Sequence, residues 1–484
     1  MTASATPAEF DRRAREALGD AQLHGALHRA TTLFAERRRN AMASVGDWES
    51  ARERARAIKD ETLLHLDRYL EQFAAAAERA GAVVHWARDA REACAIIGGI
   101  ARARGARTVV KSKSMATEEI HLNAALAAGG LEPVETDLGE YIIQLAGETP
   151  SHIVVPAIHK TRGQIAALLA AKLGIAVGDD VASLTAAART TLRQRFAAAD
   201  LGISGVNFGV AETGTILILE NEGNARLTIT LPRTHIALMG IEKVIPRVAD
   251  LDVFLQLLPR SGTGQALTTY QSLITGRRPA SADGPDELHI VLLDNGRSAM
   301  LARAVTRQAL ACIRCGACLN ACPVYQQIGG HAYGSVYPGP IGAVITPQLA
   351  GLHEAAALPY ASSLCGACRD ACPVKIDIPA LLLHLRGSVV ERRAAGPRRG
   401  ERLAFRLYRA AMARPALYLL AARLMRAAQR LLGARADGAL AARLVPPLGA
   451  WTAWRDLRPV ARRSFRDEWS HGLGDAGRGG SETK

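Results

Sequence analysis

Cysteine is the residue type in this sequence with the clearest capacity for chemistry. Seven of the eight cysteines lie between Cys312 and Cys372, in the runs CIRCGACLNACP and CGACRDACP. The first run has the spacing C-x2-C-x2-C-x3-C-P, which is typical of bacterial ferredoxins. Paired C-x2-C spacings also bind structural zinc, but zinc takes separate sets of four ligands, and interleaved cysteines with two Cys-Pro endings fit it poorly. The pattern therefore predicts iron–sulfur clusters.

The spacing also predicts how the sulfurs divide between two clusters. In two-cluster ferredoxins, the fourth cysteine of such a run ligates the other cluster. Cluster 1 is therefore expected to be a [4Fe-4S] centre held by Cys312, Cys315, Cys318 and Cys372. Cluster 2 has three cysteines, which are Cys322, Cys365 and Cys368. Ser362 stands three residues before Cys365, where a fourth cysteine is expected, so cluster 2 is either [3Fe-4S] or a [4Fe-4S] centre with one iron held by a different ligand or left open.

The segments that position these clusters should form several domains, because 484 residues are too many for one core. Residues 8–80 are rich in Ala, Leu, Glu and Arg and lack proline, which predicts helices. From there to about residue 300, β-branched runs alternate with helical stretches, which predicts an α/β domain with a parallel sheet. The spacer between the cysteine runs contains a loop and then a helix, which favours an α-helical ferredoxin domain. The expected domains are 1–80, 81–300, 301–385 and a basic helical tail at 386–484.

Within the α/β region, the runs AVVHW, TVVKSKS, PVETDL and HIVVPAI are expected to be strands that each precede a helix. A β-rich passage follows, made of GVNFGVAETGTILILENEG, RLTITLP and HIALMGIEKVIP, and ELHIVLLDNG closes the domain. Residues 259–264 and 276–286 are rich in Gly, Ser, Pro or Asp and are expected to be surface loops.

Ligands of open parallel sheets bind beyond the carboxyl ends of the strands, where this sequence has several polar groups. Lys111, Ser112 and Lys113 end one predicted strand, and Glu212 and Thr213 lie in a predicted turn. We take these five residues as a candidate cofactor-binding pocket. Other polar groups expected at the same edge are Glu135, Asp137, Glu140, His159, Lys160 and residues 220–224. A solvated loop is the alternative for the lysine–serine run, and helix capping is the alternative for His159. No G-x-G-x-x-G or Walker pattern identifies a nucleotide cofactor.

Several passages outside the cysteine runs resemble a known family. VVKSKSMATEEIHLNAAL, ETDLGEYIIQLAGETPSHIVVPAIHKTR, NFGVAETGTILILENEGNAR and PGPIGAV, together with CIRCGACLNACPVY, are similar to the LutB-type (LutB/YkgF) iron–sulfur proteins of lactate utilization. The resemblance implies a NagB/RpiA-like lactate-utilization domain, then an α-helical ferredoxin domain, then a family tail. It also implies oxidation of L-lactate to pyruvate with two companion proteins, one of which carries paired cysteine-rich domains. The seven-cysteine pattern is similar to the family's own.

Two other functions are compatible with these residues. The α/β domain is one candidate for a catalytic or ligand-binding module, acting on another 2-hydroxy acid, because NagB-like folds host varied chemistry. A redox-sensing scaffold, whose clusters never turn over, is the second. Iron–sulfur clusters carry single electrons, so an electron-transfer subunit, inactive alone, is the function that the sequence favours.

The net charge of +14 is concentrated in the tail. Residues 381–484 contain 21 Lys and Arg against 8 Asp and Glu. Two amphipathic helices are expected there, with arginines at 402, 406, 409, 423, 426 and 430, followed by a segment with Trp451, Trp454 and Trp469. An acidic partner subunit or a peripheral contact with an anionic membrane would suit such a tail, and no nucleic-acid module supports binding to RNA or DNA. No secretory signal or long apolar run is visible, and clustered cysteines without a signal indicate a reducing cytoplasm.

Overall fold

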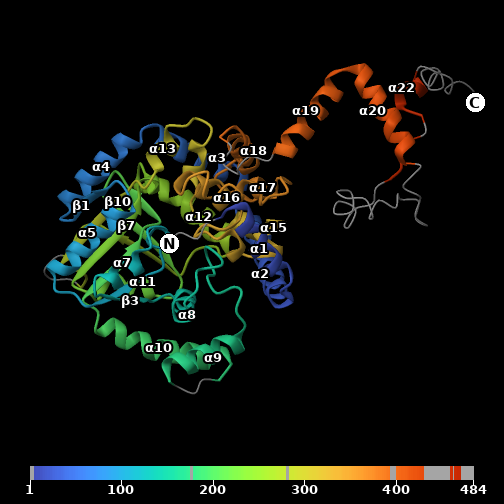
Figure 1. Cartoon of the computed structure of the whole chain (residues 1–484). Helices are drawn as coiled ribbons and strands as arrows, with labels where there is room; N and C mark the ends of the chain where they lie inside the picture. Colours follow the sequence, from blue (N-terminus) through green and yellow to red (C-terminus); the bar gives the residue numbers. More distant parts are fainter. Residues whose placement is uncertain are drawn as a thin grey trace, which may run out of the picture. The chain divides into compact units, whose positions relative to one another are not determined.

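The computed structural model describes residues 5–174, 178–278, 283–392, 399–429, 458–461 and 463–469. The chain divides into two compact units, Met1–Ala395 and Gly396–Lys484. The first unit contains both the α/β domain and the cysteine-rich module, and Figure 1 shows its sheet and the helices around it.

The α/β domain is built on a six-stranded sheet with the order β1-β10-β7-β4-β2-β3. All five strand pairings are parallel, which confirms the predicted fold class. Its strands are β1 (Val83–Ala87), β2 (Thr108–Lys111), β3 (Glu132–Glu135), β4 (Leu201–Gly205), β7 (Thr234–Gly240) and β10 (Glu287–Leu293). The central strands are buried on both faces, as parallel strands covered by helices must be.

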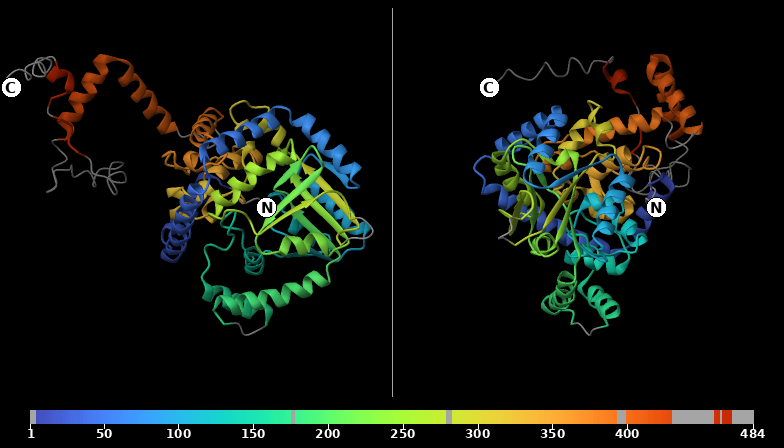
Figure 2. Two further views of the ribbon diagram at one scale, coloured as in Figure 1. Left: turned by 180° about the vertical axis from the view of Figure 1, so that it is seen from behind. Right: turned by 90° about the vertical axis from the view of Figure 1, so that its left-hand side faces the viewer.

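Helices cover one face of this sheet. The buried side chains of α5 (Ala90–Ala103) and α7 (Leu122–Ala128) form one core with Ile203, Ile236 and Val291 of the sheet. Short α6 (Met115–Glu119) precedes α7, and His121, with a φ of 52°, separates the two helices. The C-terminal half of α10 (Val181–Ala197) packs on the other face, in one cluster with Val110 of β2 and Val134 of β3. Helix α8 (Leu138–Ala146) precedes α9 (Arg162–Leu173). Figure 2 shows α9 standing off the sheet beside α10.

The opposite face carries a second sheet and the larger core. This four-stranded sheet has the order β8-β5-β6-β9. Its strands are β5 (Phe208–Val210), β6 (Thr215–Glu220), β8 (Val244–Ile245) and β9 (Tyr270–Ile274). Phe73 of α4 (Leu66–Arg79), Phe208 of β5 and Phe254 of α12 (Leu251–Gly262) are fully buried in this core. The same core continues into the cysteine-rich module without a break, so the module and the α/β domain share one interior.

The cysteine-rich module is helical, as the spacer predicted. Its helices are α14 (Ala317–Asn320), α15 (Pro323–Ile328), α16 (Gly339–Leu349), α17 (Ala367–Ala371) and α18 (Ile378–Glu391), and α13 (Arg297–Leu301) leads into it. The N-terminal helices α1 (Pro7–Leu18), α2 (Ala21–Ala43) and α3 (Trp48–Leu64) pack against it. Arg38, Arg52 and Arg56 donate to the carbonyls of Ala371, Cys372 and Lys375 respectively. The N-terminal helices therefore brace the backbone around a predicted cluster ligand.

Three local predictions were wrong. RLTITLP lies largely in α11 (Asn224–Thr230) and is not a strand, because the Glu220 carboxylate accepts the N–H groups of Ala225 and Arg226 and so caps the first turn. HIVVPAI forms turns, because His152 Nδ1 accepts the N–H groups of Val154 and Val155. The predicted loop at 259–264 is largely the buried end of α12.

The described residues of the second unit form two longer helices, α19 (Arg399–Ala413) and α20 (Pro415–Ala428), and the short α22 (Phe465–Glu468). They confirm the helical tail. Arg430, Trp451 and Trp454 lie outside the described residues. Among the helices that the structure describes, none is long and apolar enough to cross a bilayer.

Candidate iron–sulfur centre and adjoining cavity

The four cysteines assigned to cluster 1 line one small enclosure, which we call the cage. Cys312, Cys315, Cys318 and Cys372 lie there with an apolar wall that includes Ile341 and Ile376. The backbone N–H of Arg314 donates to Cys312 Sγ at 3.4 Å, and that of Ile376 donates to Cys372 Sγ at 3.4 Å. Amide hydrogen bonds to sulfur are one of the means by which proteins tune such clusters. The donor set and its apolar wall therefore fit an iron–sulfur cluster.

Three of the cage sulfurs, those of Cys315, Cys318 and Cys372, are costly to ionise without a metal. Burial raises the pKa of Cys315 to about 12 and that of Cys372 to about 11. Burial also raises the pKa of Cys318, and the other three cage cysteines raise it further. Iron would displace these protons on binding, because the thiolate is the ligand form.

The three cysteines assigned to cluster 2 form a second group nearer the surface. Burial, with the neighbouring Cys322 and Cys365, raises the pKa of Cys368 to about 12. The N–H of Tyr325 donates to Cys322 Sγ at 3.5 Å. Cys365 is exposed, and a backbone N–H from Ala367 lowers its pKa. The structure thus brings the seven cysteines together in two sets. In the first set Cys312 is half-buried and the other three are buried, and in the second set Cys365 lies at the surface.

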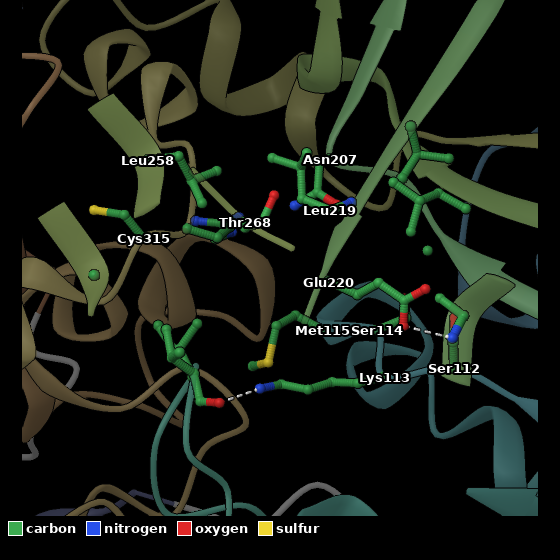
Figure 3. A pocket seen from close by; sticks show the side chains of 18 of the residues that line it. Ser112, Lys113, Ser114, Met115, Asn207, Leu219, Glu220, Leu258, Thr268 and Cys315 are labelled. Carbon is green, nitrogen blue, oxygen red and sulfur yellow. Dashed lines mark hydrogen bonds between the residues drawn. The ribbon is translucent and has the colours of Figure 1, made fainter. Parts of the chain in front are cut away.

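A cavity of about 340 Å³ adjoins the cage. It lies at the carboxyl ends of parallel strands, where Ser112 follows β2, Gly205 ends β4 and Gly240 ends β7. Figure 3 shows Ser112 and Glu220 at one end and Cys315 at the other. Arg314 and Cys315 line both the cavity and the cage. The cavity and the cluster 1 ligands therefore share a wall.

Of the five predicted pocket residues, Ser112 and Lys113 line this cavity. Lys113 extends along it, and its Nζ donates to the carbonyl of Val154 at 2.6 Å. Further polar lining residues come from the predicted strand ends: Asp137, Glu220, Asn221, Glu222 and Asn224.

The other three predicted pocket residues do not line the cavity. Lys111 points into the protein, where its Nζ lies 2.6 Å from Glu135 Oε1 and 2.9 Å from Glu118 Oε1. Burial opposes its charge, but these two carboxylates raise the pKa of Lys111 above its ordinary value. Glu212 accepts the N–H of Val248, and Thr213 donates to Thr215 in the turn between β5 and β6. These side chains hold local structure.

His159 and Lys160 also lie away from the cavity lining. His159 Nε2 and Lys160 Nζ each contact Glu148, at 2.7 Å and 2.6 Å. Together with His331, His159 and Glu148 form a group of potential metal ligands within 4.8 Å. Lys160 already supplies a cation to the Glu148 carboxylate, so an ion pair accounts for this group.

A buried charge network that was not predicted from the sequence lies between the cavity and the cage. Arg297 Nε lies 2.6 Å from Glu242 Oε2, and Arg297 Nη2 lies 2.8 Å from Glu119 Oε2. Tyr337 of the cysteine-rich module donates to Glu119 Oε2 at 2.6 Å. Arg314 Nη2 lies 3.5 Å from Glu242 Oε1, and its guanidinium carbon lies 4.5 Å from the centre of the Tyr337 ring. The network joins the α/β domain to the module.

This network carries an excess of positive charge. Lys59, whose ammonium donates to the carbonyl of Glu242, and Lys243 add two further cations to Arg297 and Arg314, against the carboxylates of Glu119 and Glu242. Burial opposes ionisation of Glu242, but Arg297 and Arg314 outweigh it and lower the pKa of Glu242 to about 2.

Lys243 is the least satisfied member of the network. Burial and the neighbouring Arg314 lower the pKa of Lys243 to about 8. Its ammonium has no hydrogen bond or ion pair within the part of the chain that the structure describes, and it lines the cavity. Arg314 Nη1 is also buried without a partner there. Glu242 and Lys243 lie two and three residues after the end of strand β7, and this position at a strand end is the signal that could have identified them.

Comparison with known proteins places this geometry in a family. Lactate utilization protein B of Bacillus pumilus is 44% identical over 459 residues, which cover 95% of this chain and 96% of that protein. The chain belongs to the lactate utilization protein B family. The protein of the same name from Bacillus cereus strain AH820 is 41% identical over 467 residues, which cover 96% of this chain and 98% of its own.

Family models divide the chain in the same order as its structure. The LUD domain matches residues 70–293, the 4Fe-4S dicluster domain matches 308–376, and the lactate utilisation protein B C-terminal domain matches 384–472. The dicluster match spans all seven clustered cysteines, which supports an iron–sulfur domain in this member of the lactate utilization protein B family. A crystal structure of a DUF162 family protein from Deinococcus radiodurans covers 47% of this chain and 98% of its own, at 15% identity and a TM-score of 0.25, which is too low to bear on the fold.

Proposed function

We propose that this chain is the electron relay of a system that oxidises L-lactate to pyruvate together with two companion proteins, one of which carries paired cysteine-rich domains. The observation that carries the proposal is the wall shared by the cavity and the cage, in which Arg314 and Cys315 contact both spaces. A molecule in the cavity would lie next to a ligand of cluster 1. The name of the relatives, lactate utilization protein B, supports lactate as the origin of the electrons.

The burial of the two cysteine sets supports a direction for the relay. Cluster 1 would be a [4Fe-4S] centre enclosed beside the cavity, whereas cluster 2 would have Cys365 exposed at its edge. Iron–sulfur clusters, when bound, take up and release single electrons, which suits the two electrons released by each lactate. Electrons would enter at the cavity, pass from cluster 1 to cluster 2, and leave at the surface around Cys365.

The charges next to the cage support a small organic anion as the electron donor. The cavity lining includes the carboxylates of Asp137, Glu220 and Glu222. Lys243 and Arg314 also line the cavity, and they belong to the network beside the cage, in which cations outnumber carboxylates. In a site with little water, such charges attract an anion more strongly than they would at the surface. The residues of this chain would hold the carboxylate of a 2-hydroxy acid, or of a carrier reduced by it, beside Cys315.

Removal of the Lys243 charge tests this entry route. We expect Lys243→Met to slow the L-lactate-dependent bleaching of the clusters by roughly 10- to 100-fold, because a hydrogen bond to a charged group contributes about 1.5–3 kcal/mol. The measurement is anaerobic stopped-flow absorbance of the full chain with its companions. The matched control is Lys160→Met, whose ammonium pairs with Glu148 away from the cavity and whose rate should equal that of the wild type.

An unchanged rate in Lys243→Met, with full iron content, would contradict electron entry through the cavity. If glycolate bleaches the clusters and L-lactate does not, the chain would still be an electron relay, with glycolate as the source of the electrons. Bleaching by dithionite alone, with no response to any 2-hydroxy acid, would favour a redox-sensing scaffold.

We also propose that the tail makes the contact with a partner subunit and that the protein works in the cytoplasm. Arg402, Arg406 and Arg409 are exposed on α19, and Leu403 and Phe405 of the same helix are exposed as well. Such a helix suits an acidic protein surface, and a peripheral contact with the inner face of an anionic membrane is the alternative.

A further inference from the structure

The two halves of the cysteine-rich module repeat one local backbone. Arg314 and Leu364 each precede the first cysteine of a C-G-A-C turn and have left-handed φ values of 62° and 58°. Gly316 and Gly366 follow with φ values of 79° and 89°, and each begins a short helix, α14 or α17. Non-glycine residues adopt positive φ only where the surroundings require it. The same unusual turn therefore presents ligands in both halves.

Within this repeat, Ser362 occupies the place of Cys312. The N–H of Arg314 donates to Cys312 Sγ at 3.4 Å, and the N–H of Leu364 donates to Ser362 Oγ at 3.1 Å. Both bonds join a side chain to the amide two residues later. Arg386 Nη2 donates to the carbonyl of Ser362 at 2.9 Å, which fixes the backbone at this point.

We infer that Ser362 Oγ is the fourth protein ligand of cluster 2, which makes that cluster a [4Fe-4S] centre with three thiolates and one serine oxygen. The inference rests on the two-cluster relay proposed above. Ligation forms an Fe–O bond and releases the hydroxyl proton to solvent, with no change in the oxidation state of iron. The N–H of Leu364 stabilises the resulting alkoxide, since hydrogen bonds to anionic oxygen are the stronger kind.

The geometry of the turn favours Ser362 over the adjacent Ser363 as the ligand. Ser363 is exposed and bonds to Cys365, whereas Ser362 is partly buried at the position that the repeat assigns to a ligand. A serine oxygen is a harder ligand than a thiolate and stabilises ferric iron. Cluster 2 should therefore have a lower reduction potential than the same cluster with four cysteines.

Tyr333 is the rival ligand within the module. Its hydroxyl is buried and has no hydrogen-bond partner among the described residues. It lies near Cys318 of the cluster 1 set as well as Cys322 and Cys368 of the cluster 2 set. From this position between the two sets, the Tyr333 hydroxyl could donate a hydrogen bond to either cluster. Tyr333 does not occupy the position in the repeated turn that Ser362 shares with Cys312.

The test is iron and sulfide analysis with EPR spectroscopy of the full chain, purified anaerobically and studied before and after dithionite. We expect about eight irons and two reduced four-iron signals in the wild type. Ser362→Ala should lose about one iron and show the signal of an oxidised three-iron cluster. Ser362→Cys should keep all its iron and raise the potential of cluster 2. The adjacent control, Ser363→Ala, should keep its iron content.

Three results would overturn the inference: a three-iron cluster 2 in the wild type, a full iron content in Ser362→Ala, or the loss of one iron in Tyr333→Phe but not in Ser362→Ala. Each of these leaves the relay intact. A wild-type protein without iron would instead contradict the proposed function itself, so the two failures are distinguishable.

Discussion

Cys368→Ala is expected to abolish L-lactate oxidation by the complete system while leaving the α/β domain folded. Cys368 is buried in the cysteine-rich module and is one of three thiols available to cluster 2. Its loss leaves cluster 2 with only two cysteine thiolates, Cys322 and Cys365, which would interrupt the route between cluster 1 and the exposed Cys365 edge. Alanine is the informative replacement, because a serine at this position would offer another oxygen ligand.

Turnover is measured anaerobically with the companions present, and circular dichroism checks the fold. Cys94→Ala is the matched control, since Cys94 lies on α5 of the α/β domain and its thiol donates to the carbonyl of Ile120, away from the cysteine-rich module. The control should retain wild-type turnover. Wild-type turnover in Cys368→Ala would show that cluster 2 takes no part in the relay.

Arg297→Met is expected to lower the free energy of unfolding by about 3–5 kcal/mol, the cost of leaving buried charges without a partner. Only 2% of Arg297 is exposed, and it pairs with both Glu119 and Glu242. Methionine has a similar length, so the loss would come from the stranded carboxylates more than from a cavity. Because Tyr337 also bonds to Glu119, the variant should loosen the joint between the α/β domain and the cysteine-rich module.

The measurement is urea denaturation followed by circular dichroism, in wild type and variant prepared identically. Arg12→Met is the control, because the Arg12–Glu16 pair is exposed and such pairs contribute about 0–1 kcal/mol. Equal midpoints for Arg297→Met and Arg12→Met would show that the buried network contributes no more than a surface pair.

The cysteine sets illustrate what sequence predicts well. The cluster itself constrains the spacing of the cysteines within each ferredoxin run. The rule that the last cysteine of a run ligates the other cluster therefore assigned Cys372 to the first set. The structure places that side chain with Cys312, Cys315 and Cys318. The parallel sheet could also be predicted from the sequence, because each strand and each helix has its own periodic pattern of hydrophobic residues.

The cavity illustrates what spacing does not predict. Lys111 ends a strand at the expected edge, yet the carboxylates of Glu135 on β3 and Glu118 on α6 hold it inside the protein. Of the five predicted pocket residues, Ser112 and Lys113 line the cavity. Arg314 and Lys243 come from segments far apart in the chain, and only packing brings them to one space. The helix at RLTITLP likewise depends on the Glu220 carboxylate, a tertiary cap that outweighs β propensity.

The most direct test of the relay is EPR spectroscopy of the anaerobic full chain, frozen with its companions before and after addition of L-lactate. Because the cavity and the cage share a wall at Cys315, we expect L-lactate, without dithionite, to produce the EPR signals of reduced four-iron clusters. We expect pyruvate to form at the same time. Clusters that dithionite reduces but that stay oxidised while lactate is converted to pyruvate would contradict the relay.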